Sequence, residues 1–336
     1  MKIGFLGCGL IASAHASNLA VVDEAAIDLV YDIDAERAAR FADETGGTLA
    51  SSVVEVIDGS DAVYVTTWTS EHASLVEQVV AAGKAVFCEK PLGVDLAAAK
   101  QMCAAVEHAD VINQVGLVLR RSPAFRWMQH QMTSGEFGTP MSIVFRDDQY
   151  IPIQGMYGST WRGDRALAGS GTLLEHSIHD LDLIEWMLGP IERVSCTTAN
   201  VHGIEGIEDQ ATVMLTAANG ASAVLSSTWH DVMTRPSQRH VEGFCQNGYI
   251  ELAGDWYGPI GLSTGNEEPQ HWHGADVVEL AHELDGRGAN ADADFVDCIL
   301  NDRPAYPDFT VALRAHVLAD AAYRSAANGS ASINVG

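Results

Sequence analysis

The sequence predicts an α/β protein in two parts: a doubly wound parallel sheet at the N-terminus, then an α+β part with a largely antiparallel sheet. Before about residue 120, short apolar runs alternate with helical patterns of about 10–15 residues, which is typical of a parallel sheet with helices on both faces. From Pro140 onward, apolar and polar residues alternate, and Asn219-Gly220 and Asn247-Gly248 indicate hairpin turns. We therefore expect two domains, residues 1–120 and 121–336.

The first domain opens with a strand, a tight turn and a helix. Residues 3–6 are an apolar strand, and residues 12–20 are small and compatible with a helix. Between them the spacing is G-x-G-x-x-A. Gly7 permits the turn, Gly9 lets backbone amides approach a pyrophosphate, and Ala12 lets the helix pack closely on the strand. The helix N-terminus then faces the phosphates, with Leu10 and Ile11 in its first turn. The alternative is a glycine turn without a ligand.

A second apolar run, residues 27–31, ends at Asp32, about 20 residues after the glycines. An acidic residue at this point accepts hydrogen bonds from the adenosine ribose hydroxyls. It also favours NAD over NADP, because a 2′-phosphate would meet a carboxylate, and Ile33 replaces the arginine or serine that would bind a phosphate. The alternative is a loop aspartate that caps the helix predicted to begin near Ala35.

The other expected elements follow from the same patterns. A helix at 35–45 ends at Gly46-Gly47, and Ser51-Ser52 precede a short helix that runs through residue 57. The rest of the first domain has strands at 62–66, 85–88 and 111–119 and helices at 71–82 and 96–108. The second domain has strands at 141–145, 194–198, 211–215 and 222–227 and helices at 124–133, 172–188, 290–300 and 308–327.

Composition excludes several classes of partner. The formal net charge of −26 argues against nucleic acid or an anionic membrane surface. No apolar run approaches the ~20 residues of a membrane span, and no signal peptide precedes the first strand, so we expect a cytoplasmic protein. The six cysteines are scattered without a C-x-x-C pair, which predicts reduced, mostly buried thiols.

Lys90 is one of only four lysines in the chain. It lies in the turn Glu89-Lys90-Pro91, at the carboxyl end of the strand predicted at 85–88, which is where ligands bind in open α/β sheets. A lysine in a cleft binds a hydroxyl or a developing alkoxide, or carries a proton if its pKa is lowered. The alternative is a solvated lysine on a surface turn.

A second polar cluster begins at Gly169-Ser170-Gly171 and continues into the helix predicted at 172–188. On that helix Glu175, His179, Asp182 and Trp186 fall on one face, at i, i+4, i+7 and i+11. A carboxylate four residues before an imidazole can fix its orientation or support its proton transfer. The alternative is a buried polar pair without a catalytic role.

Two histidine pairs also raise the question of a metal site, but neither has a third ligand at a recognisable spacing, so we expect none. The pairs are His176 with His179 and His271 with His273.

In this order, Gly7-x-Gly9-x-x-Ala12, the Glu89-Lys90-Pro91 turn and Glu175-x-x-x-His179-x-x-Asp182 resemble the Gfo/Idh/MocA family. Its namesakes are glucose–fructose oxidoreductase, inositol dehydrogenase and a rhizopine-catabolism protein. Supporting matches span most of the chain: Thr67 and His72 after the fourth strand, Gly116, Arg120 and Pro123 at the domain junction, Trp161-Arg162 before the glycines, and the last helix, 315–326.

The resemblance implies an N-terminal Rossmann domain and a C-terminal α+β domain whose open sheet often mediates oligomers, so we expect a homodimer or homotetramer. It implies reversible hydride transfer between nicotinamide and a secondary alcohol of a sugar, polyol or inositol-like substrate. Lys90, His179 and Glu175 would be catalytic. The lysine stabilises the alkoxide-like oxygen or shares the proton relay, the histidine takes the hydroxyl proton, and the glutamate orients the histidine or binds a neighbouring hydroxyl.

The remaining implied contacts fall into two sets. The expected cofactor contacts are Gly7, Gly9, Leu10, Ile11, Asp32, Thr67, Trp68, His72, Glu89 and Lys90. The expected substrate contacts are Lys90, Arg120, Trp161, Arg162, Glu175, His176, His179 and Asp182.

The chain departs from the family pattern at three places. Trp68 replaces a usual proline, Glu175 replaces an aspartate, and His176-Ser177 replace an apolar residue and a glycine. These changes bear on the identity of the substrate more than on the class of reaction. Three other functions stay open: a redox-neutral NAD-dependent glycosidase, a reductase of a keto-sugar or imine, and a non-catalytic sugar sensor. The presence of both Lys90 and His179 argues against the sensor.

Overall fold

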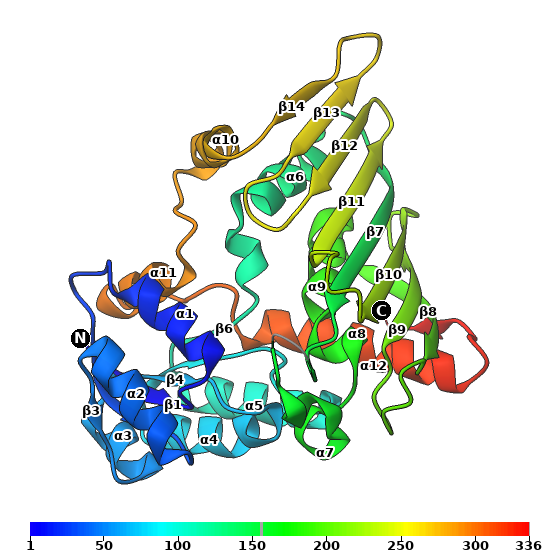
Figure 1. Ribbon diagram of the computed structural model, residues 1–336. Coiled ribbons are helices and arrows are strands. Elements are labelled where there is room, and N and C mark those ends of the chain that lie inside the picture. Colours follow the sequence, from blue (N-terminus) through cyan, green and yellow to red (C-terminus); the bar gives the residue numbers. More distant parts are fainter. Residues whose placement is uncertain (155–156, 336) are drawn as a thin grey trace. The chain divides into compact units, whose positions relative to one another are not determined.

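The computed structural model describes residues 1–154 and 157–335, and its chain divides into two units (Figure 1). The first unit contains Met1–Leu117 and Asn290–Leu313, and the second contains Val118–Ala289 and the residues from Arg314 onward. The sequence predicted one boundary near residue 120. The division differs from this expectation because residues 290–313 return to the first unit.

The first unit is built on a six-stranded parallel sheet in the order β3-β2-β1-β4-β5-β6, so the predicted doubly wound fold is confirmed. The strand order reverses between β1 and β4, and a ligand crevice forms at such a switch point. The strands are β1 (Lys2–Leu6), β2 (Ala26–Tyr31), β3 (Thr48–Leu49), β4 (Ala62–Val65), β5 (Ala85–Cys88) and β6 (Asn113–Val115). The helices between them are α1 (Leu10–Leu19), α2 (Ala35–Thr45), α3 (Val53–Gly59), α4 (Thr69–Ala81) and α5 (Leu96–Ala109).

One predicted strand is much shorter than expected. The sequence placed a strand at 111–119, but β6 ends at Val115, and the chain turns into a 3₁₀ helix, η1 (Val118–Arg121). The apolar residues Leu117 and Leu119 are buried as a strand would bury them, which is why the pattern resembled one.

Aromatic rings fill the core of the first unit. Phe5, Tyr64 and Phe87 are direct neighbours on β1, β4 and β5, and their rings stack at 4.8 and 4.7 Å between centroids. Phe295 of α11 (Ala291–Leu300) closes this stack edge-on, 5.7 Å from Phe87. Burial of these rings therefore explains why a segment so late in the sequence belongs to the first unit. Figure 1 shows α11 beside α1.

A buried ion triad joins the same elements. His15 on α1 lies between two carboxylates: its Nδ1 is 2.7 Å from Asp292 Oδ1, and its Nε2 is 3.0 Å from Glu89 Oε1. Both ionised carboxylates only accept hydrogen bonds, so both ring nitrogens must carry protons. Burial alone lowers the pKa of His15, but its hydrogen bonds to the Asp292 and Glu89 carboxylates outweigh this effect and raise the pKa to about 10.

The second unit is built on a nine-stranded sheet in the order β14-β13-β12-β11-β7-β10-β9-β8-β15. It is antiparallel apart from the parallel pair β7 and β10, as the alternating sequence predicted, and both expected hairpins join antiparallel neighbours. The strands are β7 (Pro140–Tyr150), β8 (Ile191–Ala199), β9 (Gln210–Ala217), β10 (Ser222–His230), β11 (Gln238–Cys245), β12 (Gly248–Ala253), β13 (Ile260–Thr264), β14 (Gln270–Trp272) and β15 (Ile333–Asn334).

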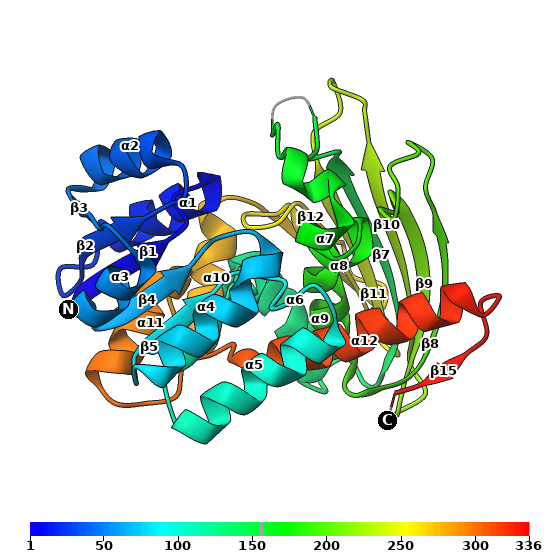
Figure 2. The same cartoon turned by 90° about the horizontal axis from the view of Figure 1, so that it is seen from below.

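Helices pack against this sheet and carry part of the candidate site. They include α6 (Pro123–Thr133), α8 (Thr172–Glu175) and α9 (Ile178–Leu188), which contact strands from β7 to β12. The long helix α12 (Phe309–Ala327) begins in the first unit, and its C-terminal part contacts β8 in the second, where Ser325 Oγ accepts a hydrogen bond from the Cys196 amide (Figure 2). The other helical segments are η2 (Thr160–Gly163), α7 (Arg165–Ala168) and α10 (Ala275–Asp285). No helix in the described ranges has the length and apolar character needed to cross a membrane.

The triad predicts a distinct dependence of stability on pH. Because the pKa of His15 is raised from 6.5 to about 10, its stabilising contribution is complete below about pH 6.5 and is lost as the pH rises through about 10. We expect His15→Gln to lower the free energy of unfolding by about 3–5 kcal/mol at neutral pH, since two carboxylates lose their buried partner. Its stability should also change less than that of the native protein between pH 7 and 10.

Urea unfolding at several pH values measures both effects. The control is His108→Gln, on the exposed end of α5, which should leave the pH dependence unchanged. Parallel pH profiles for the native protein and His15→Gln would contradict the assignment of an imidazolium.

Candidate functional site

The glycine turn of the first unit has the geometry of a phosphate cradle. Gly7 has φ +92°, and a Cβ there would lie 2.7 Å from the Thr66 carbonyl oxygen, so only glycine fits. A Cβ at Gly9 would meet no heavy atom within 4 Å, so the space before α1 is open. The first turn of α1 has no side-chain cap and no acidic residue, and Leu10 and Ile11 are exposed. These backbone amides therefore suit an anionic ligand.

Asp32 follows β2 beside this turn. Its two oxygens accept the backbone amides of Cys8 and Asp34, each at 2.8 Å, and Arg37 Nη1 lies 3.1 Å away. The cap of α2 is Asp34, whose side chain accepts the amides of Glu36 and Arg37. The alternative that Asp32 caps this helix is thus wrong. Its carboxylate is held at the carboxyl edge of the sheet, close to the glycine turn.

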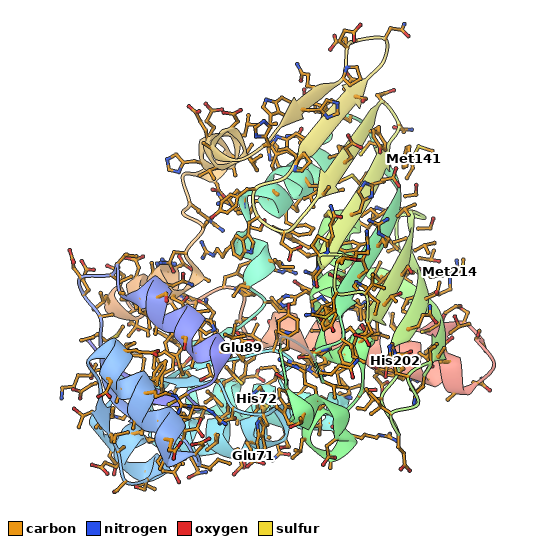
Figure 3. The ribbon with its side chains drawn as sticks, in the orientation of Figure 1. Glu71, His72, Glu89, Met141, His202 and Met214 are labelled. Atoms are coloured by element: carbon orange, nitrogen blue, oxygen red, sulfur yellow. The ribbon has the colours of Figure 1, made fainter. Side chains whose placement is uncertain are left out.

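The segment after β4 is tied to the turn after β5. Trp68 is the N-cap residue of α4, and His72 on that helix is buried, with Nδ1 3.0 Å from the Pro91 carbonyl and Nε2 3.3 Å from that of Thr67 (Figure 3). Burial lowers the pKa of His72, so the ring is neutral and has one N–H group. We assign that proton to Nδ1, where the contact is shorter. His72 thereby supports the turn that contains Lys90.

Glu89 has its partners within the protein. One carboxylate oxygen bonds to His15, and the other accepts the Lys90 backbone amide at 3.1 Å. Only glycine fits at 116, because a Cβ there would lie 2.1 Å from Glu89 Oε1. This geometry makes Glu89 a support for the backbone of Lys90, and its expected contact with the cofactor stays a prediction. His15 was missed altogether, because its two carboxylate partners are far away in the sequence.

In the second unit, the predicted continuous helix 172–188 is wrong. The chain forms α8, which ends at Glu175, and α9, which begins at Ile178, with His176 and Ser177 at the break. Glu175 and His179 therefore do not share one helix face. His179 lies buried in the first turn of α9, and the Glu175 carboxylate accepts a hydrogen bond from Arg162 Nε at 2.5 Å.

The other expected substrate residues of this unit form two arginine–tryptophan–carboxylate groups. Arg120 binds Asp182 in a bidentate pair, with both contacts at 2.7 Å, and its guanidinium lies 5.0 Å from the Trp186 ring. Burial raises the pKa of Asp182, and Arg120 opposes that rise. In the other group, the Arg162 guanidinium stacks on Trp161 at 4.6 Å and pairs with Glu175. Each cation is thus balanced by a buried carboxylate.

A residue that sequence reasoning missed fixes the glycine segment before α8. Glu208 accepts the backbone amides of Gly171 and Leu173, at 2.8 and 3.0 Å, and the hydroxyls of Ser170 and Tyr323. A Cβ at Gly171 would lie 1.8 Å from the Glu208 carbonyl oxygen, so glycine is required there. The residues next to Glu208 in the sequence do not indicate that it binds this segment.

The structure therefore gathers the expected residues into two groups. In the first unit, the glycine turn, Asp32 and the Lys90 turn all lie at the carboxyl ends of β1, β2 and β5. In the second, Arg162 pairs with Glu175 at the end of α8, and Arg120 pairs with Asp182 on α9, on the two sides of the helix break. Within 1–154 and 157–335, no three histidine, cysteine or acidic residues are arranged to hold a metal ion.

Two family descriptions match the chain. Residues 1–117 match the "Oxidoreductase family, NAD-binding Rossmann fold", and residues 125–251 match the "GFO/IDH/MocA C-terminal domain". The first match covers the glycine turn, Asp32 and Lys90, so the first unit is an NAD-binding Rossmann domain. The second covers the helix break and His179.

Characterised relatives are similar over most of their length. Myo-inositol 2-dehydrogenase of Thermotoga maritima is 30% identical over 264 residues, which is 76% of this chain and 73% of that protein. The 1,5-anhydro-D-fructose reductase of Ensifer adhaerens is 29% identical over 273 residues, or 79% and 77% of the two chains.

Solved structures share the fold. Levoglucosan dehydrogenase in complex with NADH and levoglucosan superimposes with a TM-score of 0.88 at 20% identity, covering 100% of this chain and 99% of that one. The WlbA dehydrogenase of Bordetella pertussis, in complex with NADH and UDP-GlcNAcA, gives 0.87 at 23% identity, covering 99% and 97%.

The position of Asp32 predicts how the protein selects its dinucleotide. A 2′-phosphate close to this carboxylate meets like charge, whereas Arg37 beside it would attract the phosphate once the carboxylate is gone. We expect Asp32→Ala to shift the NAD-to-NADP affinity ratio toward NADP by on the order of 10- to 1,000-fold. Adding Arg37→Ala should reverse part of that gain.

Titration with NADH and NADPH, followed by fluorescence, measures the ratio. Glu36→Gln, which removes an exposed carboxylate from the same helix, is the control and should leave it unchanged. Unchanged selectivity in Asp32→Ala would show that another group discriminates the ribose.

Proposed function

The chain belongs to the GFO/IDH/MocA oxidoreductase family, and from this premise we propose that it transfers a hydride between NAD and a secondary alcohol of a sugar or polyol. The observation that carries the proposal is the Lys90 turn at the carboxyl end of β5, anchored by Glu89 and His72 in a Rossmann domain. The names of the relatives, an inositol dehydrogenase and an anhydrofructose reductase, support the class of substrate.

NAD, when bound, supplies the nicotinamide carbon that accepts or gives up the hydride. The fit of the first unit to this cofactor rests on the open turn before α1 and on the position of Asp32. The amides at Gly9, Leu10 and Ile11 would bind the pyrophosphate, and Asp32 would accept the ribose hydroxyls. Thr67 and Trp68, which follow β4, would line the cofactor site next to the glycine turn.

The second unit would supply the proton acceptor. During oxidation His179 would take the hydroxyl proton, and Lys90 would stabilise the alkoxide-like oxygen as the hydride leaves. We propose that Arg120, Trp161, Arg162, His176 and Asp182 bind the other hydroxyls. Because Glu175 pairs with Arg162, we now propose that it orients this arginine in addition to any effect on His179.

Separable phenotypes test these roles. Lys90→Met and His179→Ala should bind NADH with near-native affinity but lose on the order of 10²–10⁴ in turnover, the usual scale for a positioned acid–base group. Glu175→Gln should lose less, since it positions other groups. The measurement combines NADH fluorescence titration with turnover at 340 nm on a panel of cyclic polyols, aldoses and sugar acids.

Lys100→Met is the matched control, because this lysine is exposed on α5 of the same unit. If His179→Ala keeps more than about a tenth of native turnover, the histidine is structural and the proton acceptor lies elsewhere. Substrate turnover without net NADH formation would favour the redox-neutral alternative instead.

We also propose that two copies of the chain associate through the open face of the second unit's sheet. Met214, Val224 and Val144 are direct neighbours across β9, β10 and β7, and all three are exposed, by 61, 39 and 45%. Beside this row Phe244 packs on Tyr249, with ring centroids 4.9 Å apart. Figure 3 labels Met214 on this sheet. An apolar row in the middle of a polar face suits a self-complementary contact between two copies.

Light scattering at low micromolar concentration tests this proposal. We expect a mass of at least twice 35.9 kDa for the native chain and a shift toward the monomer for Met214→Glu, which buries a charge in the contact. Val201→Glu, an exposed apolar residue in the loop after β8, is the control. A native monomer at this concentration would refute the proposal.

A cytoplasmic location is proposed on the state of the cysteines. All six are free and buried, as expected in a compartment that keeps thiols reduced. Fractionation of the source cells would check it, and recovery of the protein outside the cytoplasm would contradict it.

A further inference from the structure

The break between α8 and α9 is held by one aspartate on a distant strand. His176 Nε2 lies 3.1 Å from Asp147 Oδ2, and Ser177 Oγ donates to the same oxygen at 2.9 Å. Asp147 belongs to β7 and is buried, with 2% of its surface exposed. His176 and Ser177 are also the two positions at which the chain departs from the apolar–glycine pair of its family. The two residues that depart from the family pattern therefore contact the same carboxylate, that of Asp147.

A second polar layer supports Asp147. Arg239, also buried, lies 3.4 Å from Asp147 Oδ2 through Nη2, but its closer contacts are to Asp180 at 2.6 Å and Asp255 at 2.9 Å. Ser227 Oγ lies 2.6 Å from Ser177 Oγ, which extends the network to β10. Asp147 thus connects the break between α8 and α9 to strand β7 through its contacts with His176 and Ser177.

The position of the proton on His176 follows from these contacts. Nε2 is 3.2 Å from Arg239 Nη2, which only donates, and 3.1 Å from the Asp147 carboxylate, which only accepts when ionised. Nε2 cannot make both hydrogen bonds. Arg239 has two closer carboxylates, so we assign the proton to Nε2, which donates it to Asp147. This bond fixes the plane of the imidazole.

We propose that Asp147 is a positioning residue that sets substrate selectivity by fixing His176 and the start of α9. The inference rests on the proposed function, in which His176 and His179 contact the substrate. His179 follows Ser177 by two residues, so a shift of the break changes the direction of both imidazoles. Epimers of one polyol differ only in the direction of a hydroxyl, and they are discriminated by donors and acceptors held in fixed directions.

The test removes only the charge of Asp147, and it includes a measurement of stability because Asp147 also faces Arg239. In Asp147→Asn the shape is kept, and Arg239 retains its two closest partners, Asp180 and Asp255. The amide oxygen still accepts one hydrogen bond, but the charge that orients the His176 N–H is gone. The effect should therefore concentrate at the helix break.

The experiment compares selectivity, defined as the ratio of kcat/KM for the two epimeric polyols that the native enzyme distinguishes best in the substrate panel. We expect Asp147→Asn and His176→Leu each to change this ratio by about tenfold, while NADH affinity stays near native. The effects of the two changes should be less than additive in the double variant, because part of the effect of Asp147 passes through His176. A merely structural role would instead lower stability and act equally on both epimers.

Asp148→Asn is the matched control. Asp148 is the next residue on β7, is also buried and pairs with Arg235, so the same change should leave the ratio unaltered. His176→Leu with Ser177→Gly, which restores the pair usual in the family, gives a second route if Asp147→Asn does not fold.

Unchanged selectivity in folded Asp147→Asn, or additive effects in the double variant, would overturn the inference. The absence of any NAD-dependent turnover by the native enzyme across the substrate panel would instead overturn the proposed function, so the two failures are distinguishable.

Discussion

The imidazolium of His15 donates its two N–H groups to Glu89 and Asp292, and three segments of the first unit depend on that arrangement. His15 lies on the helix that follows the glycine turn, Glu89 holds the backbone of Lys90, and Asp292 belongs to a helix nearly 280 residues further along the chain. In a buried environment each carboxylate would be costly without its partner. One positive charge thus links helix α1 to the turn that contains Lys90.

The second unit uses the same principle with arginine. Arg120, Arg162 and Arg239 each pair with at least one buried carboxylate, and two of them also pack on a tryptophan ring. A guanidinium held at two edges keeps its direction, which a solvated side chain does not. Rigid polar groups of this kind suit a substrate with several hydroxyls, because each hydroxyl must find a donor or acceptor already in place.

Local patterns predicted much of this architecture. The glycine turn, Asp32, the Lys90 turn and both hairpins follow from spacing within a few residues, since turns and short strands depend on local conformational preference. The failures have a common cause: the pairing partner was remote. The helix at 172–188 is broken because His176 and Ser177 bond to Asp147 on β7, and helical periodicity contains no information about that strand. In the same way His15 and Glu208 looked ordinary, because their partners come from other elements.

The pairing of buried charges also decides how variants of the site can be interpreted. Removing Asp182, for example, takes the bidentate partner from Arg120, which is buried beside Trp186. A loss of turnover could then result either from the missing carboxylate or from a displaced arginine. Uncharged replacements of similar shape, such as Asp182→Asn, keep part of the hydrogen bonding but still leave the arginine charge unbalanced. A double change of both partners removes the unbalanced charge and isolates the contribution of the pair. For Arg120 and Asp182, therefore, the double variant is more informative than either single variant, whereas Arg239 keeps Asp180 and Asp255 when Asp147 alone is changed.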